Sequence, residues 1–143
     1  MFASERRIRF TEMEYGIPRE HGPEAVRRVL QVASRPEHAV GFPIEVRFVA
    51  GDDVILSAAH ARDTCYVAVH QDRTRDWRPY FGAVEEIMNT YGGRPHWGKR
   101  HFQTAETLEP RYPRWGEFLA LREPLDPSGV FVNGYLQRVL GLG

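Results

Sequence analysis

Apolar and charged positions alternate along Arg7–Ile17, close to the start of the chain. Ile8 and Phe10 open the alternation, which resumes out of phase from Met13 onward. A period of two residues is that of a β-strand, so the pattern predicts a strand here. The slipped position near Thr11–Glu12 predicts either a bulge or a change of the buried face.

Three later stretches carry apolar residues at the three- and four-residue spacing of a helix that buries one side. The first is Glu24–Ser34, whose arginines fall outside the apolar stripe. A second helix is expected to be capped by Asp76 and to end at Tyr91. A third is expected over Tyr112–Arg122, with Pro124 ending it.

Two further stretches are rich in strand-forming residues. Ile44–Ala50 alternates and places Glu45 and Arg47 side by side on one face. Thr64–Gln71 is apolar throughout its middle, which predicts a central strand covered on both faces. Val130–Leu140 fits a last strand or a short helix equally well. This order of elements predicts an α+β fold, in which an antiparallel sheet carries helices packed on one face.

Composition narrows the classes of function. The 143 residues fit one domain with a hydrophobic core, at 42% hydrophobic and 27% charged residues. Lys+Arg and Asp+Glu balance at 19 each, so no general attraction for nucleic acid is expected. The apolar runs are too short for a transmembrane segment, and the single Cys65 fits a reducing compartment. We therefore expect a cytoplasmic protein without a nucleic-acid partner, with membrane association left open.

The stretch Arg94–His101, RPHWGKRH, concentrates residue types that binding and catalysis use. It holds two histidines, three permanent cations, a tryptophan and a glycine within eight residues. A packed core has little use for this mixture, because each buried charge or imidazole must find a partner. The stretch predicts an anionic or hydroxylated group nearby, or else a solvated basic loop.

Four residues have both a functional and a plain structural interpretation. Glu45 and Arg47 could bind hydroxyl groups and an oxyanion, or they could form an exposed ion pair. His70 could serve a site at the end of its strand or be a hydrogen-bonded core histidine, and Lys99 could be an ordinary surface lysine. A metal site is not expected, because one cysteine is insufficient and neither CxxC nor HExxH occurs.

Longer segments resemble a known family. RPHWGK with the preceding YGG, the strand PIEVRFVAGDD, and the tail YPRWGEFLALREPLDPSGVFVNGYLQRVLG resemble the C-terminal end of aldonolactone and alditol oxidases, flavoproteins of the vanillyl-alcohol-oxidase type. The resemblance covers essentially all 143 residues. It implies part of an FAD-dependent oxidoreductase that oxidises a sugar lactone or polyol hydroxyl by hydride transfer to flavin. Residues 1–143 would be its ferredoxin-like, substrate-binding cap, inactive alone because the flavin-binding domain or subunit is missing.

The resemblance also implies roles for individual residues. Glu45 and Arg47 match the Glu-x-Arg pair of the family, which faces substrate and flavin. Lys99 matches the lysine that closes HWGK, and His96 matches its histidine, near the flavin edge. His70 falls where alditol-oxidising members place a strand histidine. The expected catalytic residues are Glu45, Arg47 and Lys99; His70 joins the first two in substrate binding, and His96 joins Lys99 beside the cofactor.

One departure from the family pattern and one alternative function stay open. Asp72 stands where alditol-oxidising members carry a hydroxyl residue, which favours a lactone or sugar-acid derivative as substrate. The alternative is a non-catalytic α+β interaction module, with Arg94–His101 as an anion-binding loop. For a cap without its flavin domain, an exposed docking face also predicts a homodimer.

Overall fold

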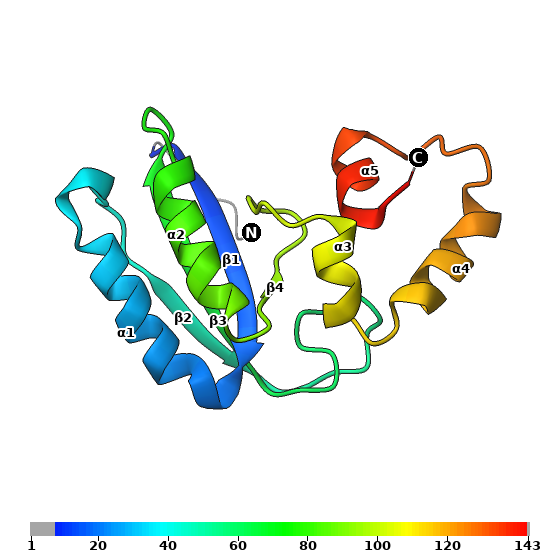
Figure 1. Ribbon diagram of the computed structural model, residues 1–143, viewed down its shortest axis with the longest axis horizontal. Coiled ribbons are helices and arrows are strands. Elements are labelled where there is room, and N and C mark those ends of the chain that lie inside the picture. Colours follow the sequence, from blue (N-terminus) through cyan, green and yellow to red (C-terminus); the bar gives the residue numbers. More distant parts are fainter. Residues whose placement is uncertain (1–7, 143) are drawn as a thin grey trace, which may run out of the picture.

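The computed structural model of the protein describes residues 8–142 and is built on a four-stranded antiparallel sheet (Figure 1). The strand order is β2-β3-β1-β4. The elements β1, α1, β2, β3, α2 and β4 follow one another along the chain in the order of the ferredoxin-like fold. The strands are β1 (Phe10–Pro18), β2 (Glu45–Val49), β3 (Thr64–Asp72) and β4 (Arg94–Pro95). The predicted α+β, ferredoxin-like class is confirmed.

Two long helices cover one face of the sheet, α1 (Gly22–Ala33) and α2 (Arg78–Asn89). Both helices have a proline in the first turn. Backbone N–H groups there make no bond within the helix, so the missing N–H of proline costs no hydrogen bond. Asp76, the expected cap of the second helix, lies one residue before the N-cap position, which Trp77 occupies. Asp76 still accepts a hydrogen bond from the Arg78 N–H. The core between helices and sheet is contributed by Met13, Tyr15, Ile17, Cys65, Val67, Val69, Ala25, Val29, Val32, Tyr80, Phe81, Val84, Ile87 and Met88.

The first strand contains no bulge. Each residue of β1 faces one residue of β3, from Phe10 opposite Asp72 to Pro18 opposite Thr64. The apolar residues instead change face: Phe10 shares a face with Glu12 and Glu14, while the residues between them enter the core. The predicted bulge is therefore wrong, and a change of the buried face accounts for the slipped pattern. Arg7 lies outside the described residues.

The C-terminal third forms a second, smaller core beside the sheet (Figure 1). The stretch whose pattern was undecided contains a helix, which Asn133 caps by accepting from the Leu136 N–H. The helix that was expected to end before Pro124 continues to Leu125, so Pro124 lies inside its last turn. Trp97 joins this core from the stretch that the sequence singled out. The helices of this part are α3 (Ala105–Leu108), α4 (Trp115–Leu125) and α5 (Gly134–Leu140).

Three 3-10 turns complete the described elements: η1 (Arg19–His21), η2 (Pro36–His38) and η3 (Glu109–Arg111). Among residues 8–142, none of the helices combines the length and the apolar character that crossing a bilayer requires.

Candidate functional site

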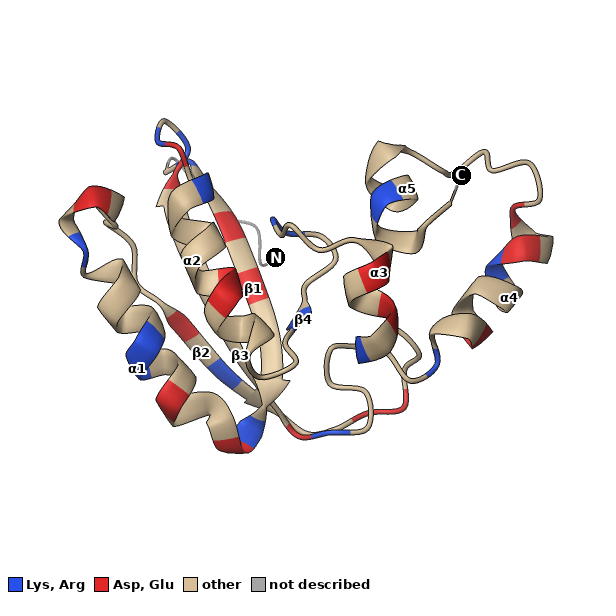
Figure 2. Cartoon of the chain, in the orientation of Figure 1, with Lys and Arg blue, Asp and Glu red and all other residues tan. Residues whose placement is uncertain are grey.

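The face of the sheet opposite α1 and α2 carries a set of charged side chains, here called the open face. Because side chains alternate along a strand, β1 presents Glu12 and Glu14 there while its apolar residues enter the core. Glu45 and Arg47 on β2 lie opposite Ala68 and Tyr66 of β3, which share this face. Figure 2 shows these acidic and basic positions as bands on β1 and β2. Two of the predicted site residues, Glu45 and Arg47, therefore share this face with two carboxylates that the sequence analysis did not select.

A short turn brings Lys99 onto the same face. The stretch that follows β4 runs along β1, with the His96 N–H donating to the Glu14 carbonyl and the Arg100 N–H donating to the Glu12 carbonyl, each at 2.9 Å. Between these two anchors the chain folds outward, closed by a bond from the Lys99 N–H to the His96 carbonyl. The Gly98 N–H donates to His96 Nδ1 at 3.0 Å, and a Cβ at this position would lie only 3.3 Å from His96 Cε1.

The Lys99 ammonium pairs with both carboxylates of β1. Its Nζ donates to Glu12 and to Glu14, while Arg47 Nη2 donates to the other oxygen of Glu14. Burial alone would raise the pKa of Glu14, but the hydrogen bonds from Lys99 and Arg47 lower it below its ordinary value. Burial would likewise lower the pKa of Lys99, and the bonds to Glu12 and Glu14 raise it. With the pKa of Glu14 lowered and the pKa values of Arg47 and Lys99 raised, these three groups are ionised at neutral pH.

His70, the remaining predicted site residue on a strand, lies at the end of this cluster that Phe10 and Phe42 cover. It stands opposite Glu12 in the register, and its Nε2 lies 3.3 Å from the Glu12 carboxylate. The ring contacts Phe10 edge-on and is tilted against Phe42, and it is almost fully buried. His70 is therefore joined to Lys99 through Glu12, and its buried ring leaves little surface for direct contact with a substrate.

Two shallow hollows flank the ion-paired cluster. One has a volume of about 310 Å³. The other has a volume of about 380 Å³ and lies at the Lys99 side of β1. Each is near the lower end of the volumes typical of small-molecule sites. The first is lined by Glu14, Arg47, Val49, Tyr66 and His96, and the second by Phe10, Thr11, Glu12, Gly98, Lys99 and Arg100.

Tyr66 is a further polar group on this face that the sequence did not reveal. Burial and the nearby carboxylates of Asp52 and Glu14 raise the pKa of its phenol, so it stays protonated and can donate a hydrogen bond. Arg47 lies over its ring, with 6.0 Å between the guanidinium carbon and the ring centroid. The phenol is hidden in the sequence because it falls within a continuous apolar run.

Other residues of the RPHWGKRH stretch hold the turn in place. Arg94 is buried, and its guanidinium donates to the carbonyls of Arg111 at 2.6 Å and of His60 at 2.8 Å. Trp97 Nε1 donates to the Leu56 carbonyl at 3.2 Å, and its ring packs among the aromatic side chains of the second core. These residues serve the fold, and the cation that the turn presents to the cluster is Lys99.

His101 is buried and supports the same turn from the other side. Its Nε2 lies 2.9 Å from the hydroxyl of Tyr135, and that hydroxyl donates to the Trp97 carbonyl at 2.6 Å. Because the phenol proton is already used, the histidine must donate from Nε2. Burial and the charge of Arg138 lower the pKa of His101 to about 4, so its ring is neutral at pH 7.

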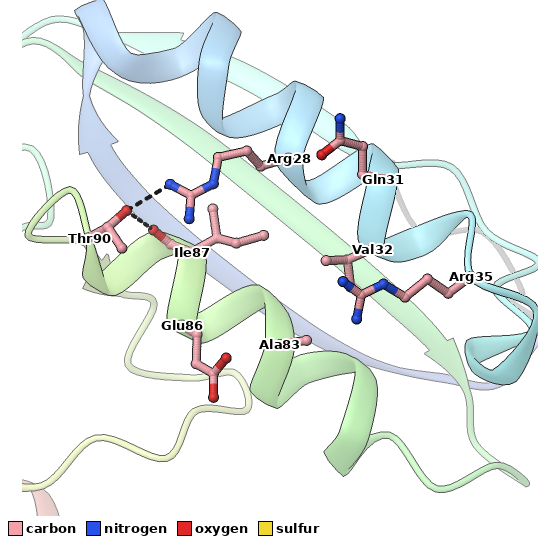
Figure 3. A pocket seen from close by; sticks show the side chains of 8 residues that line it. All are labelled: Arg28, Gln31, Val32, Arg35, Ala83, Glu86, Ile87 and Thr90. Atoms are coloured by element: carbon pink, nitrogen blue, oxygen red, sulfur yellow. Dashed lines mark hydrogen bonds between the residues drawn. The ribbon is translucent and has the colours of Figure 1, made fainter.

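Another concavity lies away from the open face, between α1 and α2, with the sheet behind the helices (Figure 3). Its polar residues come from both helices, and Arg28 donates to the hydroxyls of Thr90 at 3.0 Å and Tyr91 at 2.9 Å. These bonds join the helices to one another. None of the predicted site residues lines this groove, which leaves the open face as the candidate site.

The described residues give no support for metal or thiol chemistry. Within residues 8–142 there is no group of three or more His, Cys, Asp or Glu side chains that could hold a metal ion. Cys65 is fully buried in the core, and burial raises the pKa of its thiol. The open face instead offers paired cations and carboxylates, which can bind hydroxyl groups and stabilise developing negative charge.

Comparisons with known proteins find relatives along almost the whole chain. A sequence profile described as D-arabinono-1,4-lactone oxidase matches residues 1–139. An L-gulono-1,4-lactone dehydrogenase of Mycobacterium tuberculosis is 59% identical over 141 residues, which cover 99% of this chain and 33% of that protein. L-gulonolactone oxidase of Bos taurus is 38% identical over 97% of this chain and 33% of its own length. An alditol oxidase of Streptomyces sp. is 37% identical over 90% of this chain and 31% of its own length. The chain thus spans about a third of the length of the relatives that it matches.

Proposed function

The chain belongs to the D-arabinono-1,4-lactone oxidase family, and we propose that its open face is the substrate-binding wall of an FAD-dependent sugar-lactone or polyol oxidoreductase. The observation that carries this proposal is the arrangement of Glu45, Arg47 and Lys99. These residues come from β2 and from the turn after β4, and the sheet register brings them to one face. Glu14 of β1 bridges the two cations, and Glu12 pairs with Lys99.

The residues of the open face fit the ring of a flavin. Lactone and alditol oxidases of this family are FAD-linked in general. The exposed guanidinium of Arg47 and the ammonium of Lys99 suit the negative charge that a reduced flavin ring carries. His96 is exposed beside them and would lie near the same ring. The remaining flavin-binding groups would come from polypeptide outside these 143 residues, in a flavin-binding domain or subunit.

Each group of this chain has a defined task in the proposed reaction. FAD, when bound, would supply the hydride acceptor for the carbinol carbon of the substrate, whose hydroxyl proton would pass to solvent as the carbonyl group forms. Arg47 and Lys99 would stabilise the negative charge that develops on the substrate oxygen. The exposed carboxylate of Glu45 would accept hydrogen bonds from neighbouring hydroxyls and so orient the reacting carbon. His70, buried against Glu12, would support the substrate-binding set from beneath.

A lactone or sugar-acid derivative suits this face better than an open-chain polyol. Asp72 follows His70 on the same side of β3, where a polyol chain could be bound by a hydroxyl residue. Its Oδ1 instead accepts from the Thr74 N–H at 2.8 Å and from the Thr74 hydroxyl at 2.6 Å. These bonds commit the Asp72 carboxylate to the turn after β3. We therefore place the sugar toward Arg47, Glu45 and Lys99.

The alternative of a basic anion-binding module is less well supported by the contacts. Lys99 is paired with two carboxylates, and Arg94 donates to buried carbonyls. Neither is a free cation for a polyanionic partner.

The proposal is tested by combining the chain with candidate flavin-binding domains. Coexpression should give a yellow complex whose flavin is reduced by a sugar lactone, followed as loss of the visible flavin absorbance. Lys99→Ala should slow flavin reduction by at least about 10²-fold, because a cation that stabilises developing charge is removed. Glu117→Gln, on the exposed side of α4, is the matched control and should reduce at the unmodified rate. An unchanged rate in Lys99→Ala would remove Lys99 from the mechanism.

A further inference from the structure

Glu14 combines burial with two cationic partners. Its side chain is 1% exposed, and its two oxygens accept from different cations, Oε1 from Arg47 and Oε2 from Lys99. The partners lie 33 and 85 residues away along the sequence and belong to different parts of the fold. A single buried carboxylate thus joins β1, β2 and the turn after β4.

The two cations are far more accessible than the carboxylate that holds them. The Arg47 side chain is 56% exposed and the Lys99 side chain 19% exposed. Long side chains of this kind lose considerable rotamer freedom when they are fixed in one position. Without a partner beneath them, an exposed guanidinium and an ammonium would repel each other and move apart into solvent. Glu14 lies where it prevents this separation.

We propose that Glu14 is a positioning residue, which holds Arg47 and Lys99 side by side so that both cations act on one substrate oxygen and flavin edge. This proposal rests on the proposed function for its chemical meaning. Glu12 has a different place in the cluster, because it pairs with Lys99 and lies near His70 while Arg47 pairs with Glu14. Replacing Glu14 therefore frees Arg47 and leaves Lys99 with Glu12 as its one carboxylate partner, whereas replacing Glu12 weakens the hold on Lys99 and leaves Arg47 paired.

The first test measures the ion pairs in the 143-residue chain, without flavin. Glu14→Gln keeps the shape of the buried side chain and removes its charge, so the Lys99 ammonium should titrate at lower pH, as seen by ¹⁵N NMR of Nζ. Glu117→Gln should leave the Lys99 titration unchanged. An unshifted Lys99 titration in Glu14→Gln would overturn the positioning role. The titratable and charged groups that surround Lys99 and Arg47 on the open face are Glu12, Glu14, Glu45, Tyr66, His70, His96 and Arg100.

The second test uses the complex with a flavin-binding domain. Glu14→Gln should slow flavin reduction by roughly 10–10²-fold, because the cations lose their fixed positions. The substrate concentration needed for half-saturation should change by a smaller factor. Glu14→Asp keeps the charge on a shorter stem and should recover part of the rate, which a merely structural role would not produce. It also serves as the second variant should Glu14→Gln fold poorly.

The two tests separate this proposal from the proposed function. A shifted Lys99 titration together with slowed reduction in Glu14→Gln supports the positioning role. Normal reduction in Glu14→Gln with slowed reduction in Lys99→Ala overturns the positioning role and leaves the proposed function standing. Normal reduction in Lys99→Ala overturns the proposed function itself, and the role of Glu14 in catalysis falls with it.

Discussion

At the scale of single residues, two ionisable groups of this chain are tuned in opposite ways by their surroundings. Glu14 is buried yet ionised, because Arg47 and Lys99 lower its pKa against the effect of burial. His101 is buried and neutral, because it has no carboxylate partner and burial with the charge of Arg138 lowers its pKa to about 4. Burial disfavours the charged form of both groups. Glu14 keeps its charge because two cations bind it, whereas His101 has no such partner and is neutral.

His101 makes the stability of the fold depend on pH. A histidine with a pKa of about 4 in the folded state and 6.5 when unfolded binds more protons after unfolding. Its contribution is fully present above pH 6.5 and is lost as pH falls from 6.5 toward 4. Converted through the pKa difference, the loss approaches about 3 kcal/mol. Urea unfolding at pH 7, 5.5 and 4.5 should show this decline.

A matched variant isolates the histidine from the acidic groups of the site. His101→Gln keeps a donor for the Tyr135 hydroxyl but cannot titrate, so the decline between pH 6.5 and 4.5 should become smaller. Glu14 does not interfere in this range, because its lowered pKa places its own loss of stability below 4.5. An equally steep decline in His101→Gln would show that another group is responsible.

At the scale of elements, the turn that presents Lys99 is held by contacts from outside its own strand. β4 is two residues long, so the backbone pairing with β1 gives it little independent stability. Arg94 compensates by donating to the carbonyls of Arg111 and His60 and by lying over the ring of Tyr112. Burial lowers the pKa of this guanidinium, but it stays charged at neutral pH.

Replacing Arg94 should therefore weaken the fold and the site together. Arg94→Met keeps the apolar stem but leaves buried carbonyls without donors, which should lower the free energy of unfolding by roughly 2–4 kcal/mol. Amide hydrogen exchange along residues 94–101 should become faster at the same time. Arg27→Met, on the exposed side of α1, is the control and should change unfolding by less than about 0.5 kcal/mol. Unaltered exchange in Arg94→Met would contradict the role given to its carbonyl bonds.

The main elements were predictable from the sequence because their patterns are local. The alternation around Met13 and the stripe of α1 and α2 follow from periods of two and 3.6 residues. β4 was missed, because two residues ending in a proline carry no period. Helix α5 was left undecided, because its seven residues are too few to separate the two periods.

The site was predictable only in part, for the same physical reason. Glu45 and Arg47 share a face by strand geometry alone, whereas the meeting of Lys99 with Glu12 and Glu14 joins positions 87 and 85 residues apart. No local pattern contains that contact. Glu12 and Glu14 could have been found by asking what occupies the polar side of β1 once Met13 and Tyr15 are assigned to the core.

At the scale of the whole molecule, an apolar surface lies far from the core of the sheet. We define the apolar tip as Leu121 and Leu125 on α4 with Val130 and Phe131 in the segment that follows. Each of these side chains is more than half exposed, and α4 projects at the end of the molecule opposite α1 (Figure 1). Exposed apolar groups that cluster in this way are typical of an interface.

The apolar tip gives a prediction for the chain purified without a flavin-binding partner. It should self-associate as concentration rises, because burying these side chains against another copy removes apolar area from water at about 25 cal/mol per Å². Light scattering after size exclusion should show mass growing with concentration, and Phe131→Ser should return the chain toward 16.5 kDa. Leu30→Ser, on the exposed side of α1, removes apolar surface elsewhere and should leave association unchanged. Because both variants lower exposed apolar area, a similar response from the two would mean that association is nonspecific and that the tip is not an interface.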